Sequence, residues 1–231
     1  YVDAYRFDES RQHVRWSPLF ASSDLLEDLG RERELDVCFV GSLNKEINPD
    51  RVELIEGLRS RVPIYVGSGD FIETFQRSKM ILNQCLNDDV NFRTFEAMAC
   101  GGMLLMERVG NGLGDLFEDG KHFAGYDRGD IDGLVKTIEY YLDQPELCAQ
   151  IAQTGRDEVL KKHTAMRRAE ALADALEDAR GTGRVEKRLT SRGEMKASIA
   201  RAYQAAADAY QRANIQGMYD GYAALVDQLS K

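Results

Sequence analysis

The sequence has no apolar run long enough to cross a bilayer, which takes about 20 residues, and no visible signal peptide. Positive charge is also scarce, since 30 Lys and Arg stand against 39 Asp and Glu, giving a formal net charge of −9. This balance argues against general binding to nucleic acid or anionic lipid, because both need a basic surface. The chain begins at Tyr1 rather than at Met, so we expect a preceding domain to be missing from it.

Cysteine and histidine are also few, with four cysteines and three histidines in 231 residues. The cysteines are widely spaced without a Cys-x-x-Cys pair, and the histidines are scattered. Most of the cysteines lie in apolar runs, where cysteine acts as a small hydrophobic residue. We therefore expect reduced thiols, no metal site and a cytoplasmic protein.

Short apolar runs alternate with helical patterns over the middle of the chain. Strands are predicted at 35–42, 63–69, 80–86, 103–108 and 122–126, and helices at 49–61, 70–79, 91–100, 114–120, 130–144 and 145–163. This alternation predicts an α/β fold, a doubly wound parallel sheet with helices on both faces. Ligands bind at the carboxyl ends of such strands, so the candidate loops are 41–44, 67–69, 87–91 and 107–112.

The most informative stretch is 91–102, NFRTFEAMACGG, which predicts a helix that starts directly after a strand and a loop. Asn91 suits the N-cap, and the first N–H groups of a helix attract anions because they have no partner within it. Arg93 adds a positive charge at this end, and Glu96 lies one turn along the same face. The pattern predicts half of a nucleotide site, in which the helix start and Arg93 hold a diphosphate and Glu96 holds ribose hydroxyls.

Three runs together resemble a known family. They are N-x-R-x-F-E-A at 91–97, D-V-x-F-V-G at 36–41 and H-T-x-x-x-R at 163–168. Over roughly residues 33–175 the chain resembles the C-terminal half of GT-B glycosyltransferases of the family-4 type, and more closely the CgeB-type branch, named after a spore-maturation protein. The family-4 pattern has two glutamates eight positions apart. Glu96 matches the second, whereas Asp88 replaces the first.

The resemblance implies a Rossmann-like half of a GT-B fold and a hexosyltransferase-like activity. The enzyme would move a sugar from a UDP- or GDP-linked donor to an acceptor hydroxyl, without cofactor or metal. Asp88, Arg93 and Glu96 would serve catalysis. Contacts with the donor would come from Gly41, Ser42, Gly67, Ser68, Asn91, Phe92, Arg93, Glu96 and Gly110. The acceptor site would lie largely in the missing N-terminal domain.

Each candidate residue also has a structural alternative. Glu96 could be a solvated helix residue, Arg93 could be a surface residue that pairs with Asp88 or Asp89, and Asp88 could form an Asx-turn. Lys45 and Arg51 could be additional phosphate partners, and solvated charge explains them at least as well. Two rival functions stay open: a non-catalytic nucleotide-sugar-binding or interaction module with a degenerate site, and a GT-B-type sugar-nucleotide epimerase.

We predict three regions in the chain. Residues 1–34 form a leader that connects two domains, with Trp16, Leu19 and Phe20 packed on the domain that follows, although a loosely ordered leader is an alternative. Residues 35–178 form the Rossmann-like nucleotide-sugar-binding domain. Residues 179–231 form a helical extension, which would either cross back to the first domain or make a dimer through an Ala-rich hairpin.

Overall fold

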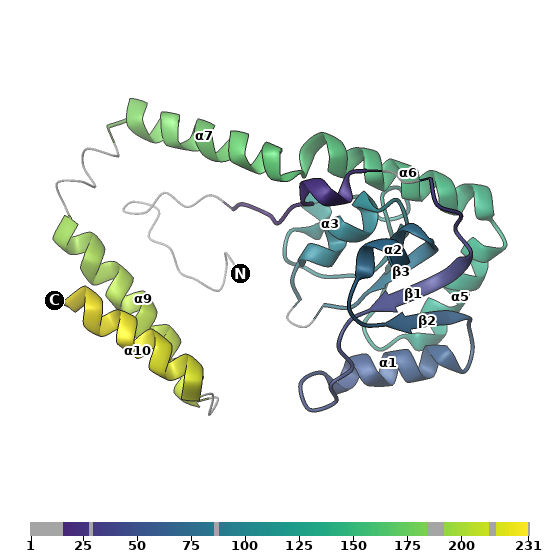
Figure 1. The fold of residues 1–231 in the computed structure, drawn as a ribbon, viewed down its shortest axis with the longest axis horizontal. Helices are drawn as coiled ribbons and strands as arrows, with labels where there is room; N and C mark the ends of the chain where they lie inside the picture. Colours follow the sequence, from purple (N-terminus) through teal and green to yellow (C-terminus); the bar gives the residue numbers. More distant parts are fainter. Residues whose placement is uncertain (1–15, 28–29, 86–87, 184–191, 213–215, 231) are drawn as a thin grey trace. The chain divides into compact units, whose positions relative to one another are not determined.

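The computed structural model describes residues 16–27, 30–85, 88–183, 192–212 and 216–230. The chain divides into two compact units between Ala169 and Glu170. The first unit holds a parallel sheet with helices on both faces, and the second is helical (Figure 1).

The sheet of the first unit has five strands in the order β2-β1-β3-β4-β5, and every neighbouring pair is parallel. The strands are β1 (Leu35–Val40), β2 (Ile64–Gly67), β3 (Ser78–Asn83), β4 (Met103–Glu107) and β5 (Ala124–Tyr126). This order confirms the doubly wound prediction. The strand order reverses between β1 and β3, which makes their carboxyl ends the switch point where ligands bind in such sheets.

Helices cover both faces of the sheet because successive strand residues point to opposite sides. The described helices of this unit are η1 (Ser23–Leu25), α1 (Pro49–Arg59), α2 (Phe71–Gln76), α3 (Phe92–Ala99), α4 (Leu113–Leu116), α5 (Ile131–Leu142) and α6 (Pro145–Lys162), followed by α7 (Ala165–Gly181), which crosses the unit boundary. Val37 and Phe39 of β1 pack with α1 and α5. Cys38 and Val40 pack with α2 and α3 on the other face.

Residues 16–27 of the predicted leader pack on the sheet domain, whereas residues 1–15 lie outside the described residues. Ala21 and Leu25 are buried, and Leu19 packs against the same core as α3. The ring of Phe20 meets the ring of Phe92 edge-on at 5.7 Å between centroids. Residues 16–27 are therefore part of this compact unit.

Several predicted boundaries are wrong. The helix expected at 70–79 ends at Gln76, and the following strand starts at Ser78, because Ser78 already pairs with β1. The short helix and turn expected at 114–120 has its helix at Leu113–Leu116, and Phe117 after it is extended. The strand expected at 122–126 starts at Ala124.

The H-T-x-x-x-R element joins the leader to the core. His163 is buried against the rings of Phe95 and Phe117. Its Nδ1 lies 2.6 Å from Nη2 of Arg168, which also donates to the carbonyl of Leu19 at 3.2 Å. Burial, and then the charge of Arg168, lowers the pKa of His163 to about 4. His163 is therefore part of the packed core.

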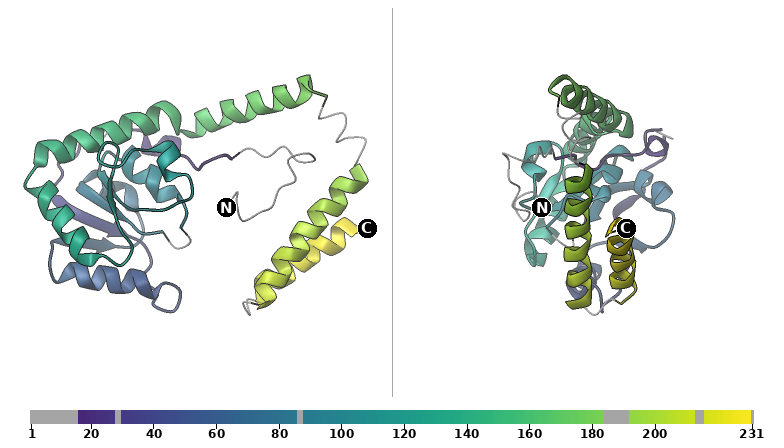
Figure 2. Two further views of the ribbon diagram at one scale, coloured as in Figure 1. Left: turned by 180° about the vertical axis from the view of Figure 1, so that it is seen from behind. Right: turned by 90° about the vertical axis from the view of Figure 1, so that its left-hand side faces the viewer.

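The second unit contains two helices that lie side by side, α9 (Arg192–Arg212) and α10 (Gln216–Ser230) (Figure 2). Tyr203 and Tyr222 pack together at 5.9 Å between ring centroids, and Ala207 is fully buried. In its described part, the extension predicted for residues 179–231 contains the helices α9 and α10. The predicted domain boundary after residue 178 stays a prediction. Helix α7 continues through this residue to Gly181.

The four cysteines are free and buried, in agreement with the predicted thiols. Burial raises the pKa of Cys85 and of Cys100 to about 12 in each case, which makes both thiols poor nucleophiles. Within the described residues, no helix combines the length and the apolar character needed to span a membrane.

The packing of α6 on α3 gives a test of the fold. A Cβ at Gly155 would clash with the carbonyl of His122 and lie 3.0 Å from Sδ of Met98. Alanine normally stabilises a helix relative to glycine by up to about 1 kcal/mol. We expect Gly155→Ala instead to lower the free energy of unfolding by about 1–3 kcal/mol, measured in urea. Gly114→Ala is the control, since nothing lies within 4 Å of its Cβ. Equal stability of the two variants would contradict the packing.

Candidate functional site

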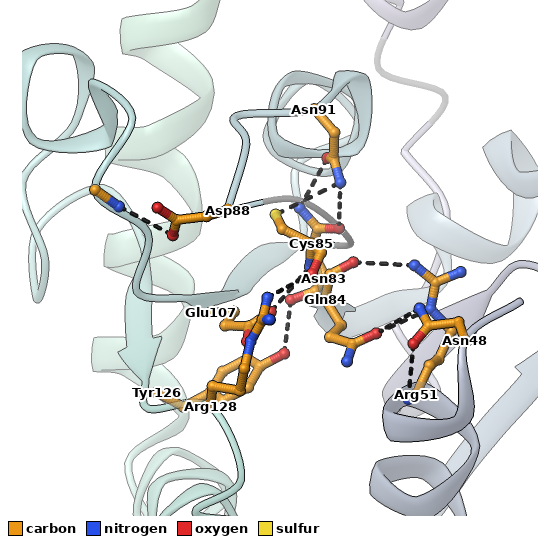
Figure 3. A network of polar contacts seen from close by, with 11 residues as sticks. Asn48, Arg51, Asn83, Gln84, Cys85, Asp88, Asn91, Glu107, Tyr126 and Arg128 are labelled. Carbon is orange, nitrogen blue, oxygen red and sulfur yellow. Dashed lines mark hydrogen bonds and ion pairs between the residues drawn. The ribbon is translucent and has the colours of Figure 1, made fainter. Parts of the chain in front are cut away.

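The candidate site lies where the loops after β1, β2, β3 and β4 meet at the carboxyl edge of the sheet. The N–H of Gly41, after β1, donates to the carbonyl of Gly67 at the end of β2 at 3.1 Å. Asp88, after β3, accepts from the N–H of Gly110, after β4, at 3.2 Å. The predicted loops are therefore joined in pairs, and Figure 3 shows the contacts around β3.

Helix α3 begins at this edge, and Asn91 is its N-cap as predicted. Its Oδ1 accepts from the N–H of Thr94 at 3.3 Å and from Nδ2 of Asn83 at 3.0 Å. Its Nδ2 donates back to Oδ1 of Asn83 at 3.2 Å (Figure 3). Asn83 is fully buried at the end of β3. This reciprocal amide pair fixes the start of α3 against the strand.

Arg93 lies across the carboxyl end of β1. Its guanidinium carbon is 5.5 Å from the ring centroid of Phe39 and 6.0 Å from that of Phe75. A Cβ at Gly41 would come 3.1 Å from Nη1 of Arg93, so the glycine leaves room for this side chain. Nε of Arg93 is buried and has no hydrogen-bond partner. Burial lowers the pKa of Arg93, and the expected alternative, an ion pair with Asp88, is not formed.

Arg51 of α1 shares the ring of Phe39 with Arg93, with its guanidinium carbon also 5.5 Å from the centroid. Its Nε donates to Oε1 of Gln84 and its Nη2 to the carbonyl of Gln84, both at 3.1 Å (Figure 3). Burial lowers the pKa of Arg51, and the charge of Arg51 contributes to lowering that of Arg93. Two partly buried cations therefore repel each other at this edge, and an anion between them would relieve that repulsion.

Glu96 is half-buried on α3 and not enclosed in the packed interior. Burial raises the pKa of its carboxyl group, Arg93 opposes this shift, and Asp24 of the leader adds to it. The carboxylate of Glu96, one helical turn after Arg93, can accept hydrogen bonds from hydroxyl groups of a ligand. Arg93 and Glu96 lie one turn apart in α3, as predicted.

Asp88 connects two loops instead of forming the Asx-turn given as its alternative. Its backbone is left-handed, with φ 52°, and its carboxylate accepts from the N–H of Gly110. Its carbonyl accepts from Nδ2 of Asn111. These contacts give Asp88 and Gly110 a shared role in shaping the loops.

A cavity of about 400 Å³ lies beside these loops. It is lined by Trp16, Ser17, Pro18, Leu19, Asp89, Val90, Gly110, Asn111, Gly112 and Asp115. The ring of Trp16 rests against Gly112, where a Cβ would come 3.0 Å from Cζ2. Oδ1 of Asp89 is buried without a hydrogen-bond partner. An aromatic face with carboxylate and amide groups suits a ligand rich in hydroxyls, and the sequence pattern gave no sign of this combination.

The remaining predicted residues lie at the same edge with fewer contacts. The carbonyl of Ser42 accepts from Nη1 of Arg51 at 3.5 Å. Ser68 and Lys45 are exposed. Phe92 is 46% exposed and contacts Phe20, so only its N–H group is suited to an anion. Arg51, offered by the sequence only as a possible partner, is a central residue of the site.

Comparison with known proteins identifies the family and the fold of the chain. Residues 11–174 match the model of the glycosyl transferase-like family, and the chain belongs to that family. No match was found among curated protein sequences.

Solved structures with the same fold include glycosyltransferases at low sequence identity. HepE of Anabaena, in complex with UDP, has a TM-score of 0.50 and 17% identity over 62% of this chain and 40% of that one. Sucrose-phosphate synthase of Thermosynechococcus elongatus has a TM-score of 0.53 and 13% identity over 71% of this chain and 50% of that one. The pneumococcal O-GlcNAc transferase GtfA, in complex with UDP and GlcNAc, has a TM-score of 0.50 and 12% identity over 70% of this chain and 38% of that one. The chain thus spans half or less of each of these proteins and has the Rossmann-like fold found in GT-B glycosyltransferases.

The amide pair at the start of α3 can be tested by substitution. Asn91→Ala removes the N-cap and takes away the donor to Oδ1 of the buried Asn83, whose Nδ2 keeps its contacts with Thr94 and Met106. We expect the free energy of unfolding to fall by about 2–4 kcal/mol in urea. Asp130→Ala, which removes the exposed N-cap of α5, is the matched control and should cost about 1 kcal/mol. Equal losses would show that the pair with Asn83 contributes nothing.

Proposed function

We propose that this chain is the donor-binding half of a glycosyltransferase that moves a sugar from a nucleoside diphosphate sugar to an acceptor hydroxyl. The observation that carries the proposal is the placement of Arg51 and Arg93 on the ring of Phe39, beside the start of α3. Two cations and a helix N-terminus at the switch point suit a diphosphate. Membership of the glycosyl transferase-like family, and the UDP bound in the HepE structure, support this assignment.

The proposed mechanism is electrostatic and does not need a metal ion. The leaving diphosphate gains charge as the glycosidic bond breaks, and Arg51, Arg93 and the N–H groups of Phe92 and Arg93 stabilise that charge. Glu96 accepts from the ribose hydroxyls and so fixes the position of the donor. The base lies over the backbone at Gly67 and Ser68, beside Gly41 and Ser42, with uracil and guanine as the candidates.

The transferred sugar occupies the cavity lined by Trp16, Asp89 and Asp115. Asp88 shapes this cavity by holding Gly110, in place of the glutamate that the family-4 pattern has there. The acceptor site and any general base come from a preceding domain, which agrees with the partial coverage of the solved structures. The CgeB-type assignment, a hexose as the transferred sugar and a cytoplasmic location belong to the same proposal.

A non-catalytic nucleotide-sugar-binding module is the second candidate. The observation that favours it is the use of the Asp88 carboxylate by Gly110, which leaves that carboxylate less free for a donor sugar. Such a module would bind UDP-sugars without transferring or hydrolysing them, even when joined to its preceding domain.

Removal of the two cations tests the diphosphate site. We expect Arg93→Met and Arg51→Met each to weaken binding of UDP or GDP about 10- to 100-fold, because each removes charge-assisted hydrogen bonds. Titration calorimetry gives the affinity, and uridine should bind equally to wild type and variants. Arg61→Met is the matched control, since Arg61 lies beyond the other end of α1 and pairs with Asp132 at 2.5 Å. Equal UDP affinity in all three variants would exclude the site.

The pH dependence of UDP binding tests Glu96. A carboxylate that accepts ribose hydroxyls binds best when ionised, so affinity should fall as pH drops through the pKa of Glu96 in the free protein. Because burial raises that pKa, the loss should begin at higher pH than for an ordinary glutamate. Glu96→Gln should remove this part of the pH profile, while the titration of the UDP phosphate stays in both proteins. Parallel profiles for the two proteins would exclude Glu96 as the ribose partner.

A further inference from the structure

Side chains bind the backbone at the carboxyl end of β3, where its backbone pairing with β4 ends. The last pair of residues in register between β3 and β4 is Asn83 with Met106. The carbonyl of Asn83 accepts from the buried hydroxyl of Tyr126 at 2.8 Å. The carbonyl of Cys85 accepts from Nη2 of Arg128 at 2.8 Å. Side chains from β5 and the residues after it thus take over the hydrogen bonds that a longer strand would have formed.

Glu107, the last residue of β4, completes this set of contacts. It is 1% exposed, and its Oε2 accepts from the N–H of Cys85 at 3.0 Å. Its Oε1 pairs with Nε of Arg128 (Figure 3). Both backbone groups of Cys85 are therefore bound by one ion pair, Glu107 at the N–H and Arg128 at the carbonyl. Charge-assisted bonds of this kind are stronger than those between neutral groups.

The same segment of backbone orients the diphosphate site. Gln84, which precedes Cys85, holds Arg51 through both its side-chain and its backbone oxygen, and Oε1 of Gln84 also accepts from Nδ2 of Asn48 at 3.1 Å. A shift of Cys85 would move Gln84 with it, and Arg51 would lose its position on Phe39.

We propose that Glu107 and Arg128 are positioning residues of the nucleotide-sugar site. They fix the backbone at Cys85, and through Gln84 they hold Arg51 in place for the diphosphate. The proposal rests on the proposed function. Neither residue needs to touch the ligand. Both carboxylate oxygens of Glu107 have protein partners, and Nε and Nη2 of Arg128 bind Glu107 and the carbonyl of Cys85.

The first test measures UDP binding by titration calorimetry. The variants are Glu107→Gln, Arg128→Met and the double variant, which removes both charges and so avoids an unpaired buried carboxylate. Each should bind UDP at least about tenfold more weakly, because a displaced Arg51 is no longer aligned with the diphosphate. Arg128→Lys keeps a cation for Glu107 and should recover part of the affinity.

Glu34→Gln and Arg77→Met are the matched controls, because this ion pair of 2.5 Å lies at the opposite edge of the sheet, before β1 and β3. Both should retain the affinity of the wild type. Retained affinity in the folded double variant would overturn the positioning role.

The second test uses amide hydrogen exchange without ligand and does not depend on nucleotide binding. The N–H of Cys85 should exchange at least about tenfold faster in Arg128→Met and in the double variant, while the amides of β1 keep their protection. A global loss of protection in both variants, or no change at Cys85, would overturn the proposal. If these variants show the local change at Cys85 but the wild type binds neither UDP nor GDP, the proposed function fails, and the positioning role in nucleotide binding fails with it.

Discussion

The site depends on the shared use of one aromatic ring by two guanidinium groups. Phe39 is buried at the end of β1, and Arg51 and Arg93 both lie 5.5 Å from its centroid. Both guanidinium groups contact this ring although their like charges repel each other, and an anionic ligand would offset that repulsion. Gly41 contributes by having no side chain where Arg93 lies. The electrostatic character of this edge follows from these four residues.

The polar contacts behind that edge keep its geometry. Asn83 and Asn91 join the end of β3 to the start of α3, while Glu107 and Arg128 bind the backbone of Cys85. Buried polar groups of this kind are stabilising only when all their partners are present, so they define one arrangement of the loops. The candidate site therefore combines the few residues around Phe39 with a larger set of polar groups that hold the strand ends and loops.

Much of the fold could be predicted from the sequence, because strand and helix periodicities are strong signals in a parallel α/β protein. The N-cap at Asn91 and the placement of Arg93 and Glu96 on one face of α3 were read correctly for the same local reason. The boundaries at Gln76 and Ser78 were not, since strand pairing decided them. The cavity beside Trp16 could not be predicted, because it joins the leader to loops more than 70 residues away.

The sequence by itself determined the alternation of strands and helices, the helix start at Asn91 and the family resemblance, because each depends on residues close together in the chain. Only the tertiary structure decided that Arg51 joins Arg93 on Phe39, that Asp88 holds Gly110, and that Glu107 and Arg128 bind the backbone of Cys85. These contacts join separate strand ends. The order of strands in the sheet, which no local pattern encodes, brings those ends together.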